Sequence, residues 1–97
     1  MITKADIVTF IHFIDFYWNG LNGAGTFTLE ELVEWVKQNE DSKYLERLLK
    51  ESLLLKEVFT KEDWEIDSSI LDFIIKNRGK NKIKRIVDCL LKISDNT

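Results

Sequence analysis

The sequence predicts an all-α fold, a single compact bundle of five or six short helices that spans residues 1–97. Through most of the chain, apolar residues recur every three or four positions, which is the spacing of one helix face. Residues that cap helices precede several of these apolar runs. No run alternates apolar and polar residues over five or more positions between turn residues, so strand signals are nearly absent.

The first helix is expected over residues 4–18. Thr3 supplies a cap oxygen, and Asp6, three residues on, suits the positive end of the helix dipole. The apolar positions that follow have helical spacing; they are Ile7, Phe10, Ile11, Ile14 and Trp18. Residues 19–25 then hold three of the four glycines, which predicts a loop.

The second helix has a complete start signal. Thr28 and Glu31 form a capping box, Phe27 can pack on Leu32, and the helix should end near Asn39. The third helix, over residues 43–56, follows Asp41 or Ser42 as its cap. Its inward-facing residues are expected to be Leu45, Leu48, Leu49 and Leu53.

The C-terminal part repeats this pattern. Thr60 and Asp63 make a further cap, and Ser69 is expected to cap a helix that ends near Gly79, since glycine commonly follows a helix end. Asn81 is expected to cap the last helix. Its inward-facing residues should be Ile83, Ile86, Val87, Leu90 and Leu91, with the sole cysteine, Cys89, as a small core residue among them.

The composition excludes several classes of protein. One cysteine and one histidine supply neither an intramolecular disulfide nor a zinc cage of cysteines and histidines. The histidine, His12, lies in mid-helix and is expected to be a partly buried structural residue. No nucleophile with a base and an orienting group stands out, and no phosphate-binding glycine loop is present, so we expect a non-enzyme without a cofactor.

The segment 20–31 resembles the calcium-binding loop of EF-hand proteins. The matching positions are Asn22, Gly25, Phe27 and Glu31. The loop departs from the family at its first and fifth positions, where Gly20 and Ala24 carry no side-chain oxygen. Calcium takes six to eight oxygen ligands, so we expect no functional metal site here.

The net charge of −3 conceals two charge blocks of opposite sign. Residues 76–85 contain six basic residues and no acid, so the rest of the chain, with 8 basic and 17 acidic residues, carries −9. Between residues 57 and 72, six acids face the single base Lys61. A smaller acidic set comprises Glu30, Glu31, Glu34, Glu40 and Asp41.

These blocks allow three interpretations. The charges can simply solvate helix faces. The basic segment can instead bind nucleic acid, because cationic side chains suit phosphate; its candidates are Arg78, Lys80, Lys82, Lys84 and Arg85. Alternatively, an acidic face with an aromatic anchor can dock onto a basic protein; the candidates for this contact are Glu62, Asp63, Trp64, Glu65 and Asp67.

In size, acidity, helicity and lack of catalytic groups, the chain resembles the small acidic immunity proteins of bacterial toxin–immunity systems. This resemblance implies a monomeric or dimeric cytoplasmic protein that neutralises a toxin, often a nuclease, by occluding it. Asp6 near the start argues against a signal peptide, and the apolar stretch 7–18 is too short to span a membrane. The expected function is therefore binding of a cognate protein partner, with nucleic-acid binding as the alternative.

Overall fold

The computed structural model describes residues 2–21, 27–59, 68–77 and 79–95. Helices account for most of these residues, and no strand occurs among them, which confirms the all-α fold. The order along the chain is η1 (Lys4–Ile7), α1 (Val8–His12), η2 (Phe13–Leu21), α2 (Leu29–Asn39), α3 (Ser42–Phe59), α4 (Ser68–Lys76) and α5 (Lys80–Asp95).

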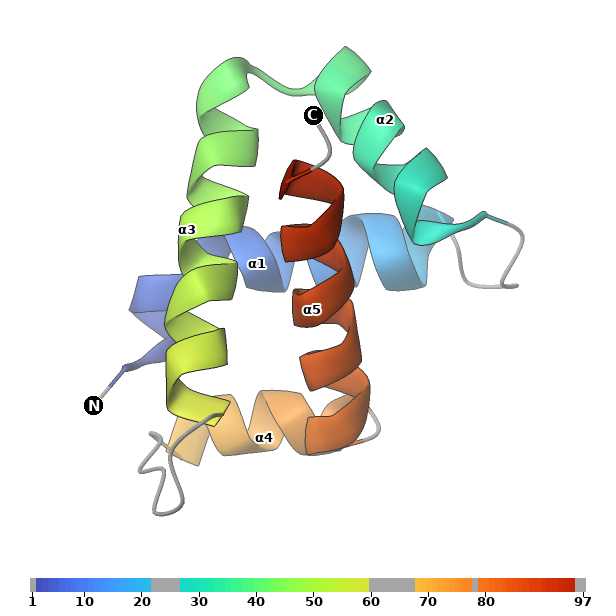
Figure 1. The fold of residues 1–97 in the computed structure, drawn as a ribbon. Helices are drawn as coiled ribbons and strands as arrows, with labels where there is room; N and C mark the ends of the chain where they lie inside the picture. Colours follow the sequence, from blue (N-terminus) through green and yellow to red (C-terminus); the bar gives the residue numbers. More distant parts are fainter. Residues whose placement is uncertain (1, 22–26, 60–67, 78, 96–97) are drawn as a thin grey trace.

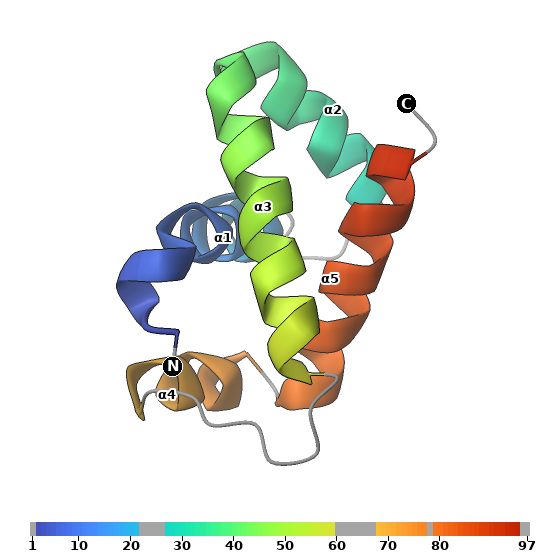
Figure 2. The same ribbon diagram turned by 60° about the vertical axis from the view of Figure 1, so that its left-hand side comes forward.

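Two long antiparallel helices form the frame of the molecule. α3 and α5 lie side by side, and the segment α1–η2 crosses both of them on one face (Figure 1). α2 packs near one end of this pair, and α4 lies across the other end (Figures 1 and 2). The crossing places one face of α1–η2 against both long helices.

The N-terminal helical segment changes its winding twice. A 3₁₀ turn (η1) leads into one turn of α-helix (α1), which widens into the π-helix η2. A π-helix bonds residue i to i+5 and is rare, usually occurring as a single turn. Here it carries the helix through Leu21, so Asn19 and Gly20, expected in a loop, are helical.

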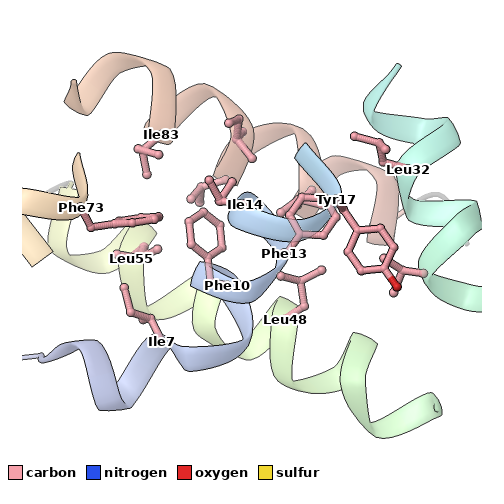
Figure 3. Packing of buried hydrophobic residues seen from close by; sticks show 14 of the residues in the cluster. Ile7, Phe10, Phe13, Ile14, Tyr17, Leu32, Leu48, Leu55, Phe73 and Ile83 are labelled. Carbon is pink, nitrogen blue, oxygen red and sulfur yellow. The ribbon is translucent and has the colours of Figure 1, made fainter. Parts of the chain in front are cut away.

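The hydrophobic core gathers on the buried side of α1–η2. Phe10, Phe13, Ile14 and Tyr17 are almost fully buried, and α3, α4 and α5 pack around them (Figure 3). Phe10 meets Phe73 of α4 edge-on, with 6.3 Å between ring centroids. A pair of rings in this arrangement stabilises the fold by more than the burial of its apolar area alone. The buried row of Phe10, Phe13, Ile14 and Tyr17 therefore connects helices that are distant in sequence.

The starts of α2 and α3 follow the expected chemistry. At α2 the Thr28 hydroxyl accepts from the Glu31 N–H at 3.2 Å, and the Glu31 carboxylate accepts from the Thr28 N–H at 3.1 Å. Asp41 caps α3 by accepting from the Tyr44 N–H at 2.8 Å. These contacts confirm the capping box and Asp41 as the cap of the third helix. The expected cap at Thr60 and Asp63 lies outside the described residues.

Two expected caps were wrong. α4 begins at Ser68 and α5 at Lys80, so Ser69 and Asn81 lie inside their helices and not before them. Gly79 follows the end of α4, as expected. Its φ of 98° is a conformation that glycine adopts without strain, and its N–H donates to the Ile74 carbonyl at 2.8 Å.

Three burial predictions were also wrong. Leu53 is 51% exposed, because the buried stripe of α3 runs through Tyr44, Leu48 and Leu55. Cys89 is exposed, since α5 turns Ile86, Val87 and Leu90 inward and leaves position 89 on the solvent side. His12 is exposed, opposite the buried face of its helix.

A buried carboxylate caps the start of α1 by accepting a hydrogen bond from its backbone. Glu51 on α3 is only 8% exposed, and its Oε1 accepts from the Phe10 N–H at 3.0 Å. Phe10 lies in the first turn of α1, where backbone N–H groups lack partners within the helix. The negative charge also suits the positive end of the helix dipole. Glu51 therefore joins α3 to α1 through a polar contact inside an apolar environment.

We predict that Glu51→Leu lowers the free energy of unfolding by about 1–3 kcal/mol, because the buried Phe10 N–H loses its acceptor. Glu51→Gln retains an amide oxygen and should lower it less. The matched control is Glu46→Leu on the exposed side of α3, with an expected change within about 0.5 kcal/mol. Urea unfolding followed by circular dichroism measures all three. Equal effects at positions 51 and 46 would contradict the capping role.

Candidate functional site

The acidic contact predicted from the sequence lies outside the described residues. This applies to Glu62, Asp63, Trp64, Glu65 and Asp67, and also to Arg78 of the basic segment. The side chain of Lys80 is likewise not described. The remaining predicted residues are on α5; they are Lys82, Lys84 and Arg85.

On α5, the structure adds an aromatic ring to the basic segment. Lys84 and Arg85 are exposed, whereas Lys82 is half-buried with its Nζ 5.5 Å from the centroid of the Trp18 ring. A cation at this distance is attracted by the π-electrons of the ring. Sequence reasoning missed this contact because Trp18 belongs to the first helical segment and has no local link to residue 82. Basic and aromatic groups are thus adjacent on this surface.

A second candidate surface is the outer side of α2. Glu31, Glu34 and Trp35 all point to solvent, while Leu32, Val33 and Val36 face the core. The Trp35 side chain is 44% exposed, and its ring meets Phe27 edge-on at 6.4 Å. Lys37 pairs with Glu34 at 3.4 Å and is the only base within α2. α2 therefore presents carboxylates beside a partly exposed tryptophan, the combination that the sequence suggested for residues 62–67.

A third surface is an aromatic cluster where η2 meets the start of α3. His12 stacks on Phe16 with ring centroids 5.4 Å apart and planes 11° apart. Nδ1 of His12 lies 2.7 Å from the Tyr44 hydroxyl, within hydrogen-bond distance. The Tyr17 hydroxyl donates to Oε1 of Glu40 at 2.9 Å. Two side-chain hydrogen bonds thus tie the N-terminal segment to the junction between α2 and α3.

Both tyrosines of this cluster hold their protons more tightly than free tyrosine. Burial, followed by the hydrogen bond to Glu40 and the charge of Glu40, raises the pKa of Tyr17 from 10.0 to about 12. Burial is also the main cause that raises the pKa of Tyr44, and the charge of Arg47 partly opposes it. Both phenols are therefore neutral near pH 7 and act as hydrogen-bonding groups rather than bases.

Within the described part of the chain, no three residues of the types histidine, cysteine, aspartate and glutamate come together as a metal site. Glu31, the last position of the loop that resembles an EF-hand, is engaged in the capping box of α2. None of the described helices combines the length and apolar character needed to cross a membrane.

Comparison with known protein-family models, with curated proteins and with solved structures finds no match to this chain.

We predict a delayed tyrosine titration in the folded protein. The chain has two tyrosines, Tyr17 and Tyr44, and both pKa values are raised. At pH 10.5 the unfolded chain should be about three quarters tyrosinate, whereas the folded protein should show little tyrosinate absorbance at 295 nm above that of its three tryptophans. The measurement is a 295 nm titration with and without urea. Superimposable curves would contradict the raised pKa values.

The same shift predicts a pH dependence of stability. The folded-state pKa of Tyr17 lies above the unfolded value. The contribution of Tyr17 to the free energy of unfolding is therefore complete below pH 10 and disappears as the pH rises toward 12. Tyr17→Phe removes the titrating group. The free energy of unfolding of this variant should therefore fall less steeply with pH than that of the wild-type protein over this range. Parallel slopes for wild type and variant in urea unfolding at pH 9 to 11 would argue against it.

Proposed function

We propose that the chain is a non-enzymatic binding module, an immunity-type inhibitor that occludes a basic protein such as a nuclease toxin. The observation that carries the proposal is the outer side of α2, where Trp35 is 44% exposed beside Glu31 and Glu34. Tryptophan is enriched among the residues that dominate interface energies. Carboxylates around such an anchor accelerate encounter with a cationic partner and favour it over an acidic one.

The proposed mechanism is steric and electrostatic occlusion without bond chemistry. A nuclease groove must be basic to hold its substrate, so an acidic helix can occupy the same groove. Glu30 also lies exposed in the first turn of α2, and the capping box holds this end of the helix in place. A rigid helix loses little conformational entropy on binding, which favours affinity. Residues 62–67, with Trp64, remain the second contact predicted from the sequence.

A second function is favoured by the contact between Lys82 and Trp18. It places an aromatic ring within the basic surface of α5, next to the exposed Lys84 and Arg85. Basic grooves with aromatic rings are the usual platform for single-stranded nucleic acid. The net charge of −9 outside residues 76–85 opposes this function, because most of the chain repels phosphate.

The protein-binding proposal predicts that Trp35→Ala weakens binding to the cognate basic protein by about tenfold or more. The probe is the product of a toxin-sized reading frame adjacent to this gene, and isothermal titration measures the affinity. Glu30→Lys with Glu34→Lys, which leaves the capping box intact, should also weaken binding, whereas the control Glu46→Lys on the exposed side of α3 should not. Wild-type affinity in both α2 variants would exclude this surface.

The sequence-predicted contact has its own test. Reversal of Glu62, Asp63 and Glu65 to lysine should weaken binding to the same basic protein while the helical circular dichroism signal is retained. Unchanged affinity would remove residues 62–67 from the interface.

The nucleic-acid alternative predicts a gel shift on random DNA and RNA that weakens steeply with salt. Lys84→Glu with Arg85→Glu should abolish the shift, while Lys50→Glu on the exposed side of α3 should leave it unchanged. Tight binding with a steep salt slope would favour this function over inhibition of a protein. No shift at low salt would exclude it.

A further inference from the structure

A stripe of four residues on α3 combines two leucines with two opposite charges. Its members are Glu46, Leu49, Leu53 and Lys56, at successive spacings of three, four and three residues. This is the a/d spacing of a coiled coil, which places all four side chains along one side of a helix. Glu46 and Lys56 are exposed, Leu53 is 51% exposed, and Leu49 is half-buried and does not belong to the core cluster. The stripe therefore leaves leucine surface in contact with solvent.

The stripe is distinct from the side of α3 that builds the core. α3 packs against α5, α1, α2 and η1, and its buried residues Tyr44, Leu48 and Leu55 belong to the core cluster. Figure 2 shows α3 at the front of the molecule, with none of the described helices over its near side. A helix of another molecule can therefore approach α3 from outside.

The stripe is complementary to itself when a second copy runs antiparallel. Its positions are symmetric about residue 51, because Leu49 and Leu53 are equally distant from it, and so are Glu46 and Lys56. In an antiparallel pair of helices, Leu49 of one copy lies opposite Leu53 of the other, and Glu46 lies opposite Lys56. Each of these contacts occurs twice, as two-fold symmetry requires. A parallel pair would instead bring like charges together, so the charges select the antiparallel order.

The charges at the two ends of the stripe have no other partner among the described residues. Neither Glu46 nor Lys56 forms an ion pair with a residue that the structure describes. Lys50 and Glu57, which flank the stripe, are also of opposite sign and add no net charge to it. A partner with one sign of charge would be attracted by one end of the stripe and repelled by the other. A second copy satisfies both ends.

We propose that two copies of this chain associate through α3 as an antiparallel pair with two-fold symmetry. One helix face buries less than the about 1,200–2,000 Å² of a stable complex, so we expect a weak dimer with a dissociation constant of about 0.1–1 mM. The chain is then monomeric at micromolar concentration, where the Glu46 and Lys50 variants still serve as controls in the experiments above. The dimer does not depend on the proposed function.

Sedimentation velocity from about 10 µM to 1 mM tests the contact, since a weak dimer appears only at the upper end of this range. Leu53→Glu places charges in the centre of the contact and should keep the chain monomeric throughout. The matched control is Ile75→Glu on α4, because Ile75 is 66% exposed and lies outside the stripe. Circular dichroism checks that both variants retain their helices. A wild-type chain that is monomeric at every concentration, or equal effects of the two variants, would overturn the proposal.

Charge reversal tests the antiparallel order. Glu46→Lys alone and Lys56→Glu alone each place like charges opposite one another at both ends of the contact. Each should weaken association about fivefold or more. An equimolar mixture of the two variants should restore it, because every lysine then lies opposite a glutamate of the other copy. Wild-type association of either variant, or a mixture that remains monomeric, would contradict the antiparallel pair.

Discussion

The structure depends on the burial of one aromatic helix face. Phe10, Phe13, Ile14 and Tyr17 present a continuous apolar row, and their segment crosses the two long helices (Figure 3). Full burial of each such side chain is worth about 1.5–3 kcal/mol, so this row is a large share of what a chain of this size can gain. Burial of this segment removes the Phe10 N–H from water, and Glu51 supplies the acceptor that it would otherwise lack. The remaining helices pack around this element.

The same burial decides which groups reach the surface. With one side of α1–η2 against α3 and α5, His12 and Phe16 must face outward, and the Tyr17 and Tyr44 hydroxyls meet Glu40 and His12 at the boundary. Within the described part of the chain, the carboxylates of the smaller acidic set lie on or next to α2, and most of the basic segment lies on α5. On α5 the ring beside the bases, Trp18, comes from another helical segment, whereas on α2 the ring, Trp35, belongs to the same helix as the carboxylates.

Local signals predicted the elements well and their surfaces less well. The capping box at Thr28 predicted the start of α2 to the residue, since the box is made by neighbours in sequence. Leu53 and Cys89 were expected in the core because they continue apolar patterns. In each helix the apolar residues cover a wider face than the neighbouring helices bury, so the residues at the edge of that face remain exposed to solvent. Periodicity identifies the apolar side of a helix but does not show how much of that side is covered. Of the two binding sites predicted from the sequence, only part of the basic one falls on described residues.

The sequence by itself determined the helical class, most helix positions, the capping chemistry and the segregation of charge, because all of these depend on residue type and on spacing along a few turns. The tertiary structure alone decided which aromatic ring lies beside the bases of α5. The contact of Trp18 with Lys82 and the network from His12 to Tyr44 join residues that are far apart in the chain. The physical reason is that helix crossing brings such groups together, and the crossing geometry is set by the packing of the whole core rather than by any local segment.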